Sequence, residues 1–268
     1  AYCLTGGYHL PLATATGSVR SDLVLVDVIL GVGELAISDH RSSQPTLDEL
    51  LRVAADAHVG GLMSGKAGIL HLHVGDGERG LGPIREALDR SEIPPVVFHP
   101  THVNRRRALL DEALALAERG CVIDITAFPV APDEDAWPAD EALLRYLDAG
   151  LPPARVTVSS DAGGCLPLFD PDGRVTEMDV GRPAALAAAL EALLARGVPL
   201  ERVLPAFTSN PARLLLLPEK GHLTTGADAD LVVLDQHGRV ADVMARGRWH
   251  VRDGRAVVRG TFEPAERT

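Results

Sequence analysis

Cysteine is scarce in this 268-residue sequence. Its three cysteines, Cys3, Cys121 and Cys165, are odd in number, widely spaced and free of any Cys-x-x-Cys pair. Such spacing favours neither a disulfide framework nor a thiolate zinc site. We therefore expect a protein of a reducing, cytoplasmic compartment.

Basic residues and long apolar runs are also lacking. The sequence has 26 Lys and Arg against 37 Asp and Glu, a formal charge of −11, so we expect no nucleic-acid partner. No apolar run approaches the roughly 20 residues that cross a bilayer, so we expect no membrane association. The length suits one large α/β domain with a substantial core.

The amino-terminal residues lack an initiator methionine, a charged leader and a signal-like apolar stretch. Residues 1–8 resemble the end of a strand that is already under way. We therefore expect a further segment upstream of Ala1, in the same protein or as a second chain.

Strands and helices alternate along most of the sequence. Six predicted strands lie near Cys3, Ile29, Leu70, Val97, Ile123 and Val158, and amphipathic helices are predicted over 18–26, 46–57, 82–90, 108–119, 139–149 and 183–196. This order predicts a parallel sheet covered by helices. A closed (β/α)8 barrel needs eight such units, so we expect residues 1–218 to form a barrel that lacks its first two units.

The pattern changes after residue 218. Short alternating strands follow one another with turns at His237-Gly238, Arg246-Gly247 and Asp253-Gly254. Residues 219–268 are therefore predicted to form part of a small β domain at the carboxyl-terminal end. Its partner strands would come from the upstream segment.

Four residues that suit a metal ion lie at the predicted carboxyl ends of four different strands: Glu34, His73, His102 and Asp161. Ligands and catalytic groups gather at that end of a parallel barrel or sheet. A single strand-end carboxylate is more often an ion-pair partner, and a lone histidine is more often a core residue. Two imidazoles and two carboxylates together instead favour Zn²⁺ or a similar divalent ion, as in metal hydrolases.

Other polar residues are placed near the same face. Arg41 and Arg105 lie on loops there and suit a substrate that carries carboxylates, although each could be a surface arginine. Tyr8 could present its phenol to a substrate carbonyl or could be a packed aromatic. His71 could be a ligand or a packing residue, and Lys66 lies at the opposite end of its strand and should not reach the site.

Several sequence blocks are specific enough to indicate a family. They are Leu4-Thr-Gly-Gly-Tyr8-His9, Ala36-Ile-Ser-Asp-His-Arg41, His73-Val-Gly-Asp76, Pro100-Thr-His-Val-Asn-Arg105, Ile123-Asp-Ile-Thr126, Ser159-Ser-Asp161, Gly226-Ala-Asp-Ala-Asp-Leu231 and Arg259-Gly-Thr-Phe-Glu263. With these blocks the chain resembles the amidohydrolase superfamily over essentially its whole length. Within the superfamily it resembles the isoaspartyl dipeptidases (β-aspartyl peptidases).

The resemblance implies a fold, a cofactor and an activity. It implies a distorted β/α barrel with a small β domain, a centre of two Zn²⁺ ions, and hydrolysis of β-aspartyl dipeptides by a metal-bridged hydroxide. The substrate would be a small dipeptide with free carboxylates, and the assembly a symmetric homo-oligomer. The open alternatives are another amidohydrolase reaction, such as N-acyl-amino-acid deacylation or cyclic-amide hydrolysis, or an inactive fragment that acts only in assembly.

The resemblance also implies roles for individual residues. His73 and His102 match the histidines of the second zinc, and Asp161 matches the aspartate that binds metal and transfers the proton. Tyr8 matches the tyrosine that polarises the scissile carbonyl. The remaining matches are the carboxylate-binding Arg41 and Arg105.

Three features depart from the pattern of some relatives. Glu34 stands where some have a carboxylated lysine that bridges the metals, and Cys165 stands where some have a substrate-binding serine. The His-x-His pair of the first barrel strand belongs to the expected upstream segment.

Overall fold

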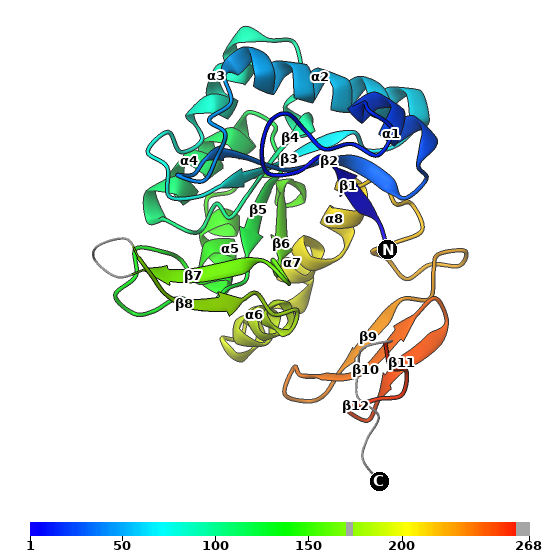
Figure 1. Cartoon of the computed structure of the whole chain (residues 1–268). Coiled ribbons are helices and arrows are strands. Elements are labelled where there is room, and N and C mark those ends of the chain that lie inside the picture. The colour runs from blue at the N-terminus through cyan, green and yellow to red at the C-terminus, as the bar shows by residue number, and fades with distance from the viewer. Residues whose placement is uncertain (170–173, 261–268) are drawn as a thin grey trace.

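Parallel strands in chain order form the main body of the computed structural model, which describes residues 1–169 and 174–260 (Figure 1). Four strands pair in sequence order in one parallel sheet: β1 (Cys3–Thr5), β2 (Ile29–Ser38), β3 (Ile69–Val74) and β4 (Phe98–Thr101). Beside β4, the next two strands form a parallel pair, β5 (Ile123–Thr126) and β6 (Val156–Ser159). This order is that of a TIM-type α/β fold, as the sequence predicts.

Helices connect the strands and cover their outer side (Figure 1). The α-helices are α1 (Val19–Leu25), α2 (Leu47–Ser64), α3 (Gly82–Arg90), α4 (Arg107–Glu118), α5 (Ala139–Asp148), α6 (Ala184–Ala195), α7 (Leu200–Val203) and α8 (Ser209–Leu214). Short 3₁₀ turns lie at Pro95–Val97, Pro153–Arg155 and Leu204–Phe207.

Helix α2 is longer than its sequence pattern indicates. A capping box of Thr46 and Glu49 starts it, as expected for a Thr-x-x-Glu motif, and Gly65 ends it in the left-handed conformation. The predicted end near residue 57 was wrong because Gly60 and Gly61 weaken the helical signal. A Cβ on Gly60 would lie 2.7 Å from the side chain of Leu23, so this glycine lets α1 and α2 approach closely.

The hydrophobic core lies between the strands and their covering helices. Leu35, Ile37, Leu70, Leu72 and Phe98 are fully buried on the strands and pack with buried leucines and alanines of the helices. The strands therefore hold their positions by close packing on both faces, which fixes the direction of the polar side chains near their ends.

An antiparallel hairpin follows β6 where the sequence analysis predicts no strand. It consists of β7 (Cys165–Phe169) and β8 (Val175–Val180), with Cys165 opposite Val180. Because β8 is exposed along its whole length, it lacks the apolar burial that makes a strand visible in a sequence.

A separate antiparallel sheet lies at the carboxyl-terminal end (Figure 1). Its strands are β9 (Leu231–Leu234), β10 (Val240–Ala245), β11 (Arg248–Arg252) and β12 (Arg255–Ala256). The last of these strands, β12, has only two residues, and the end of the Arg259–Glu263 block, from Thr261 on, lies outside the described residues. Among the described helices, none has the length and apolar character needed to cross a bilayer.

Candidate metal centre

Glu34 lies in the middle of β2, which corrects the expectation that it ends a strand. The buried apolar run before it was taken for the whole strand, but β2 continues to Ser38. The pairing of β2 with β3 is irregular between Val32 and Leu35, the stretch that contains Glu34. At Gly33 the backbone has a φ of +154° and a Cβ would lie 2.7 Å from that of His71, so a glycine is required.

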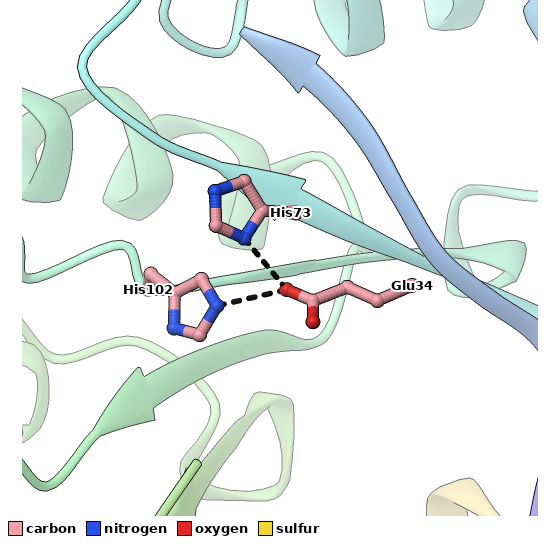
Figure 2. Close-up of side chains that lie close together, drawn as sticks. All are labelled: Glu34, His73 and His102. Atoms are coloured by element: carbon pink, nitrogen blue, oxygen red, sulfur yellow. Dashed lines mark hydrogen bonds and ion pairs between the residues drawn. The ribbon is translucent and has the colours of Figure 1, made fainter. Parts of the chain in front are cut away.

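The structure brings Glu34, His73 and His102 together (Figure 2). His73 is the last residue but one of β3, and His102 follows β4 directly in a left-handed conformation with a φ of 63°. Oε1 of Glu34 lies 2.8 Å from Nδ1 of His73 and 2.8 Å from Nε2 of His102. Three of the four predicted ligands therefore converge on one point.

Two of the three groups, Glu34 and His102, are held in the charge states that a metal ion requires. Burial opposes ionisation of Glu34, but hydrogen bonds to His102 and His73 outweigh it and hold the pKa of the carboxyl well below its usual range. Burial lowers the pKa of His102, and the charge of Arg105 adds to that effect. An ionised carboxylate beside a neutral imidazole is the state in which both can bind metal.

A network of buried side chains fixes the ring of His102. Nδ1 of His102 lies 2.8 Å from the hydroxyl of Thr126. The backbone of Thr126 is held in turn by the amide of Asn104, which donates to its carbonyl and accepts from its N–H, both at 2.9 Å. Nε2 is thereby left facing Glu34.

Asp39 also contacts the centre, although the sequence analysis assigns it no role. Its Oδ2 lies 2.9 Å from Nε2 of His73, and the guanidinium of Arg41 donates to both of its carboxylate oxygens. The Asp-x-Arg spacing in the Ser-Asp-His-Arg block could have indicated the ion pair between Asp39 and Arg41. The contact between Asp39 and His73 could not have been predicted from the sequence, because it depends on where β2 ends beside β3.

The donor set fits a divalent metal ion. The ligand atoms of Glu34, His73 and His102 all lie within 4.8 Å of one another. Two ligands of one tetrahedral Zn²⁺ ion are about 3.3 Å apart, so small side-chain movements would accommodate an ion. Oxygen and imidazole nitrogen are also ligands that Zn²⁺ accepts.

Asp161 follows β6 by two residues, at the same end of the strands. Its backbone is left-handed with a φ of 47°, and its carbonyl accepts a hydrogen bond from the N–H of Gly164 at 2.9 Å. Among the described residues it belongs to neither cluster of potential metal ligands, which are Glu34, His73 and His102, and Asp39, His40 and Asp76. Uncommon backbone conformations gather at functional sites, but the metal-binding role of Asp161 stays a prediction.

The hydroxyl of Tyr8 is buried and has no hydrogen-bond partner among the described residues. Its ring lies 4.8 Å from that of His73, centroid to centroid. Burial, together with the negative charge of Asp39, raises the pKa of the phenol well above its usual value. Tyr8 therefore keeps its proton and has one hydrogen bond to donate beside the candidate ligands.

The two predicted carboxylate-binding arginines differ. Arg41 is held by Asp39, whereas the side chain of Arg105 has no hydrogen-bond or ion-pair partner in the part of the chain that the structure describes. Arg105 is half-buried and follows His102 by three residues. Cys165 is exposed at the start of β7, four residues after Asp161.

Lys66 and His71, which were also considered from the sequence, lie away from the centre. Lys66 donates hydrogen bonds to the carbonyls of Leu23 and Val26 at the end of α1, each at 2.7 Å, rather than lying free in solvent. His71 and His99 pair through their Nδ1 atoms at 2.9 Å, deeper between the strands.

Comparisons with known proteins agree with the resemblance. The family model for amidohydrolases matches residues 96–250. The chain is similar to the β-aspartyl dipeptidase of Fervidobacterium islandicum AW-1, solved in complex with the dipeptide β-Asp-Leu: the two share 42% identity and a TM-score of 0.89, over 98% of this chain and 67% of that one. A second structure of that enzyme gives 40% identity and a TM-score of 0.85, over 98% and 66%.

A more distant similarity concerns the fold alone. D-hydantoinase from Thermus sp. shares 18% identity and a TM-score of 0.53, over 84% of this chain and 65% of its own. The chain thus spans about two thirds of the length of each of these structures.

Proposed function

The chain belongs to the amidohydrolase family. We propose that the full-length protein is a metal-dependent dipeptidase that hydrolyses β-aspartyl (isoaspartyl) dipeptides. The observation that carries the proposal is the convergence of Glu34, His73 and His102 on one point. The 42% identity with a β-aspartyl dipeptidase supports the choice of substrate.

In the proposed site Glu34, His73 and His102 would hold divalent metal, with two Zn²⁺ ions as the proposed cofactor and Glu34 in the place of the carboxylated lysine of some relatives. Bound there, the metal supplies Lewis-acid activation of water and of the amide carbonyl. Asp161 is the fourth proposed ligand from this chain.

The substrate carboxylates bind to arginines at the rim of the site. The guanidinium of Arg105 has no partner among the described residues and can form two parallel hydrogen bonds with a carboxylate. Arg41 is oriented by Asp39 and offers its remaining donors to a second carboxylate. Cys165 is proposed to contact the substrate from the start of β7.

The proposed chemistry uses Tyr8 and Asp161. Tyr8 donates its unpaired hydroxyl hydrogen to the oxygen of the β-linked amide carbonyl and stabilises the charge that develops there. Asp161 accepts a proton from the attacking water and returns it to the leaving amine as the carbon–nitrogen bond breaks.

The proposal includes parts outside this sequence. The chain spans 67% of the length of the similar dipeptidase. We propose that an upstream segment supplies the first two β/α units, with their metal ligands, to the barrel of residues 1–218. The same segment would supply the partner strands of the small β domain of residues 219–268. A symmetric homo-oligomer is proposed for the assembly.

A substrate panel tests the proposal. The metal-loaded, full-length protein is assayed with β-Asp-Leu, α-Asp-Leu, N-acetyl-leucine and a cyclic amide, and the released amine is measured. We expect turnover of β-Asp-Leu to exceed the others by at least about 100-fold, and Asp161→Asn and Tyr8→Phe each to reduce it by about 100-fold or more. Preference for N-acetyl-leucine or the cyclic amide would instead identify another amidohydrolase activity, and no turnover at all would reject a catalytic function.

A further inference from the structure

Asp39 is a buried carboxylate with an unusually complete set of partners. Only 1% of its side chain is exposed. Oδ1 accepts from the N–H of Arg41 at 2.7 Å and from its Nε at 2.9 Å, and Oδ2 accepts from its Nη2 at 2.8 Å. The fourth partner is Nε2 of His73, at 2.9 Å from Oδ2.

The position of this carboxylate is fixed by the chain around it. A Cβ on Gly75 would lie 1.9 Å from Oδ2 of Asp39, and one on Gly77 would lie 2.6 Å from the carbonyl carbon of Ser38. The loop after β3 therefore packs against Asp39 so closely that glycine is required at both positions. The backbone carbonyl of Asp39 also accepts a hydrogen bond of 2.8 Å from the side chain of Gln44.

The contact determines which nitrogen of His73 can bind a metal. The two hydrogen bonds from the Arg41 guanidinium keep Asp39 ionised, so the carboxylate has no proton to offer. Nε2 of His73 must then carry the hydrogen between them. In a neutral imidazole Nδ1 is left with a lone pair, and Nδ1 faces Glu34 at 2.8 Å.

Two electron-rich atoms at that distance repel unless a proton or a metal ion lies between them, so a metal ion at this contact would replace the hydrogen bond between Glu34 and His73. Nδ1 of His73 and Oε1 of Glu34 thus form a pair of acceptors that suits a cation. The same carboxylate–histidine arrangement raises the basicity of a ligand and fixes its ring.

We infer that Asp39 is a positioning residue of the metal site, which holds the hydrogen of His73 on Nε2 and thereby presents Nδ1 to the metal. Arg41 takes part by holding Asp39. This inference rests on the metal site of the proposed function, but not on the identity of the substrate.

Asp39→Asn tests the inference with almost no change of shape. The neutral amide loses the ion pair with Arg41 in either orientation. With its NH2 group towards His73 it favours the opposite tautomer, and with that group at the position of Oδ1 it faces two N–H donors of Arg41. In the full-length protein we expect the affinity for Zn²⁺, measured by competition with a chromophoric chelator, to fall about 10- to 100-fold, and Asp39→Ala to lower it at least as much. Asp89→Asn is the matched control and should leave the affinity unchanged, since Asp89 pairs with Arg119 at 2.7 Å and belongs to neither cluster of potential metal ligands among the described residues.

The readouts separate positioning from a general loss of structure. The metal-free variants are compared by thermal unfolding, and saturating Zn²⁺ should restore most of the turnover of Asp39→Asn if the parent is active. A crystal structure of the Zn²⁺-loaded parent needs no variant and should show Nδ1 of His73 on the metal.

Coordination through Nε2, or Zn²⁺ affinity in folded Asp39→Asn within twofold of the parent, would overturn the inference. Failure of the parent to cleave β-Asp-Leu would reject the proposed substrate and leave the Zn²⁺ result to decide the role of Asp39.

Discussion

Oε1 of Glu34 and Nε2 of His102 lie 2.8 Å apart although 68 residues separate them in the sequence. This short distance joins the middle of β2 to the end of β4, with His73 of β3 between them. Strand pairing alone does not bring a mid-strand residue to that position. The irregular segment around Gly33 is therefore the local feature on which the candidate site depends.

Replacing Glu34 tests its proposed role as a metal-binding carboxylate. Glu34→Gln keeps the size of the side chain but removes the charge that both imidazoles face, so we expect metal content per chain to fall and turnover to drop by about 100-fold or more. Elemental analysis of the purified protein measures the first effect. A variant with full metal content and parental turnover would show that Glu34 is not a ligand.

Arg105→Gln tests recognition of the substrate carboxylate. The loss of a charge-assisted hydrogen-bond pair costs about 1.5–3 kcal/mol, so KM for β-Asp-Leu should rise about 10- to 100-fold with a smaller change in kcat. Arg107→Gln is the matched control, since Arg107 lies 4.6 Å from the ring of Trp137 on an exposed face. Equal KM values for the two variants would contradict a role for Arg105.

Asn104→Ala tests the network behind His102. The substitution leaves the backbone N–H and carbonyl of Thr126 and the carbonyl of Trp137 without their partner in a buried place. We expect the free energy of unfolding to fall by about 2–4 kcal/mol in a denaturant titration. Gln236→Ala, on an exposed turn, should change it by less than about 0.5 kcal/mol. A small effect for both variants would show that the network contributes little.

The stability of the protein should depend on the protonation of His99. Burial and the neighbouring His71 lower the pKa of His99 to about 3, whereas the unfolded chain binds the proton near pH 6.5. The contribution of neutral His99 to the free energy of unfolding is therefore complete above pH 6.5. It is lost as the pH falls towards 3, at up to about 1.4 kcal/mol per pH unit.

Unfolding measured from pH 7 to pH 4 checks this dependence. The slope of the free energy of unfolding against pH reports the number of protons taken up on unfolding. In His99→Gln this number should be smaller by close to one, whereas the exposed control His237→Gln should keep the parental slope. An unchanged slope in His99→Gln would contradict the burial argument.

The sequence was sufficient for the parallel strands and most helices because their apolar periodicity is strong. Helix α3 begins and ends at the predicted residues, 82 and 90. The hairpin of β7 and β8 was missed because β8 is exposed along its whole length and carries no such pattern.

For the site, residue type was enough to select Glu34, His73 and His102, but not to place them. Glu34 was assigned to a strand end because the irregular pairing of β2 cannot be read from residue type. Asp39 was missed because its partner His73 lies 34 residues away and meets it only through the packing of β2 against β3.

The most direct test of the central claim is the rate of β-Asp-Leu hydrolysis by the full-length protein before and after metal removal. We predict that a chelator abolishes leucine release, that added Zn²⁺ restores it, and that Glu34→Gln is not restored at the same Zn²⁺ concentration. Undiminished leucine release from protein shown by elemental analysis to be free of metal would contradict the account.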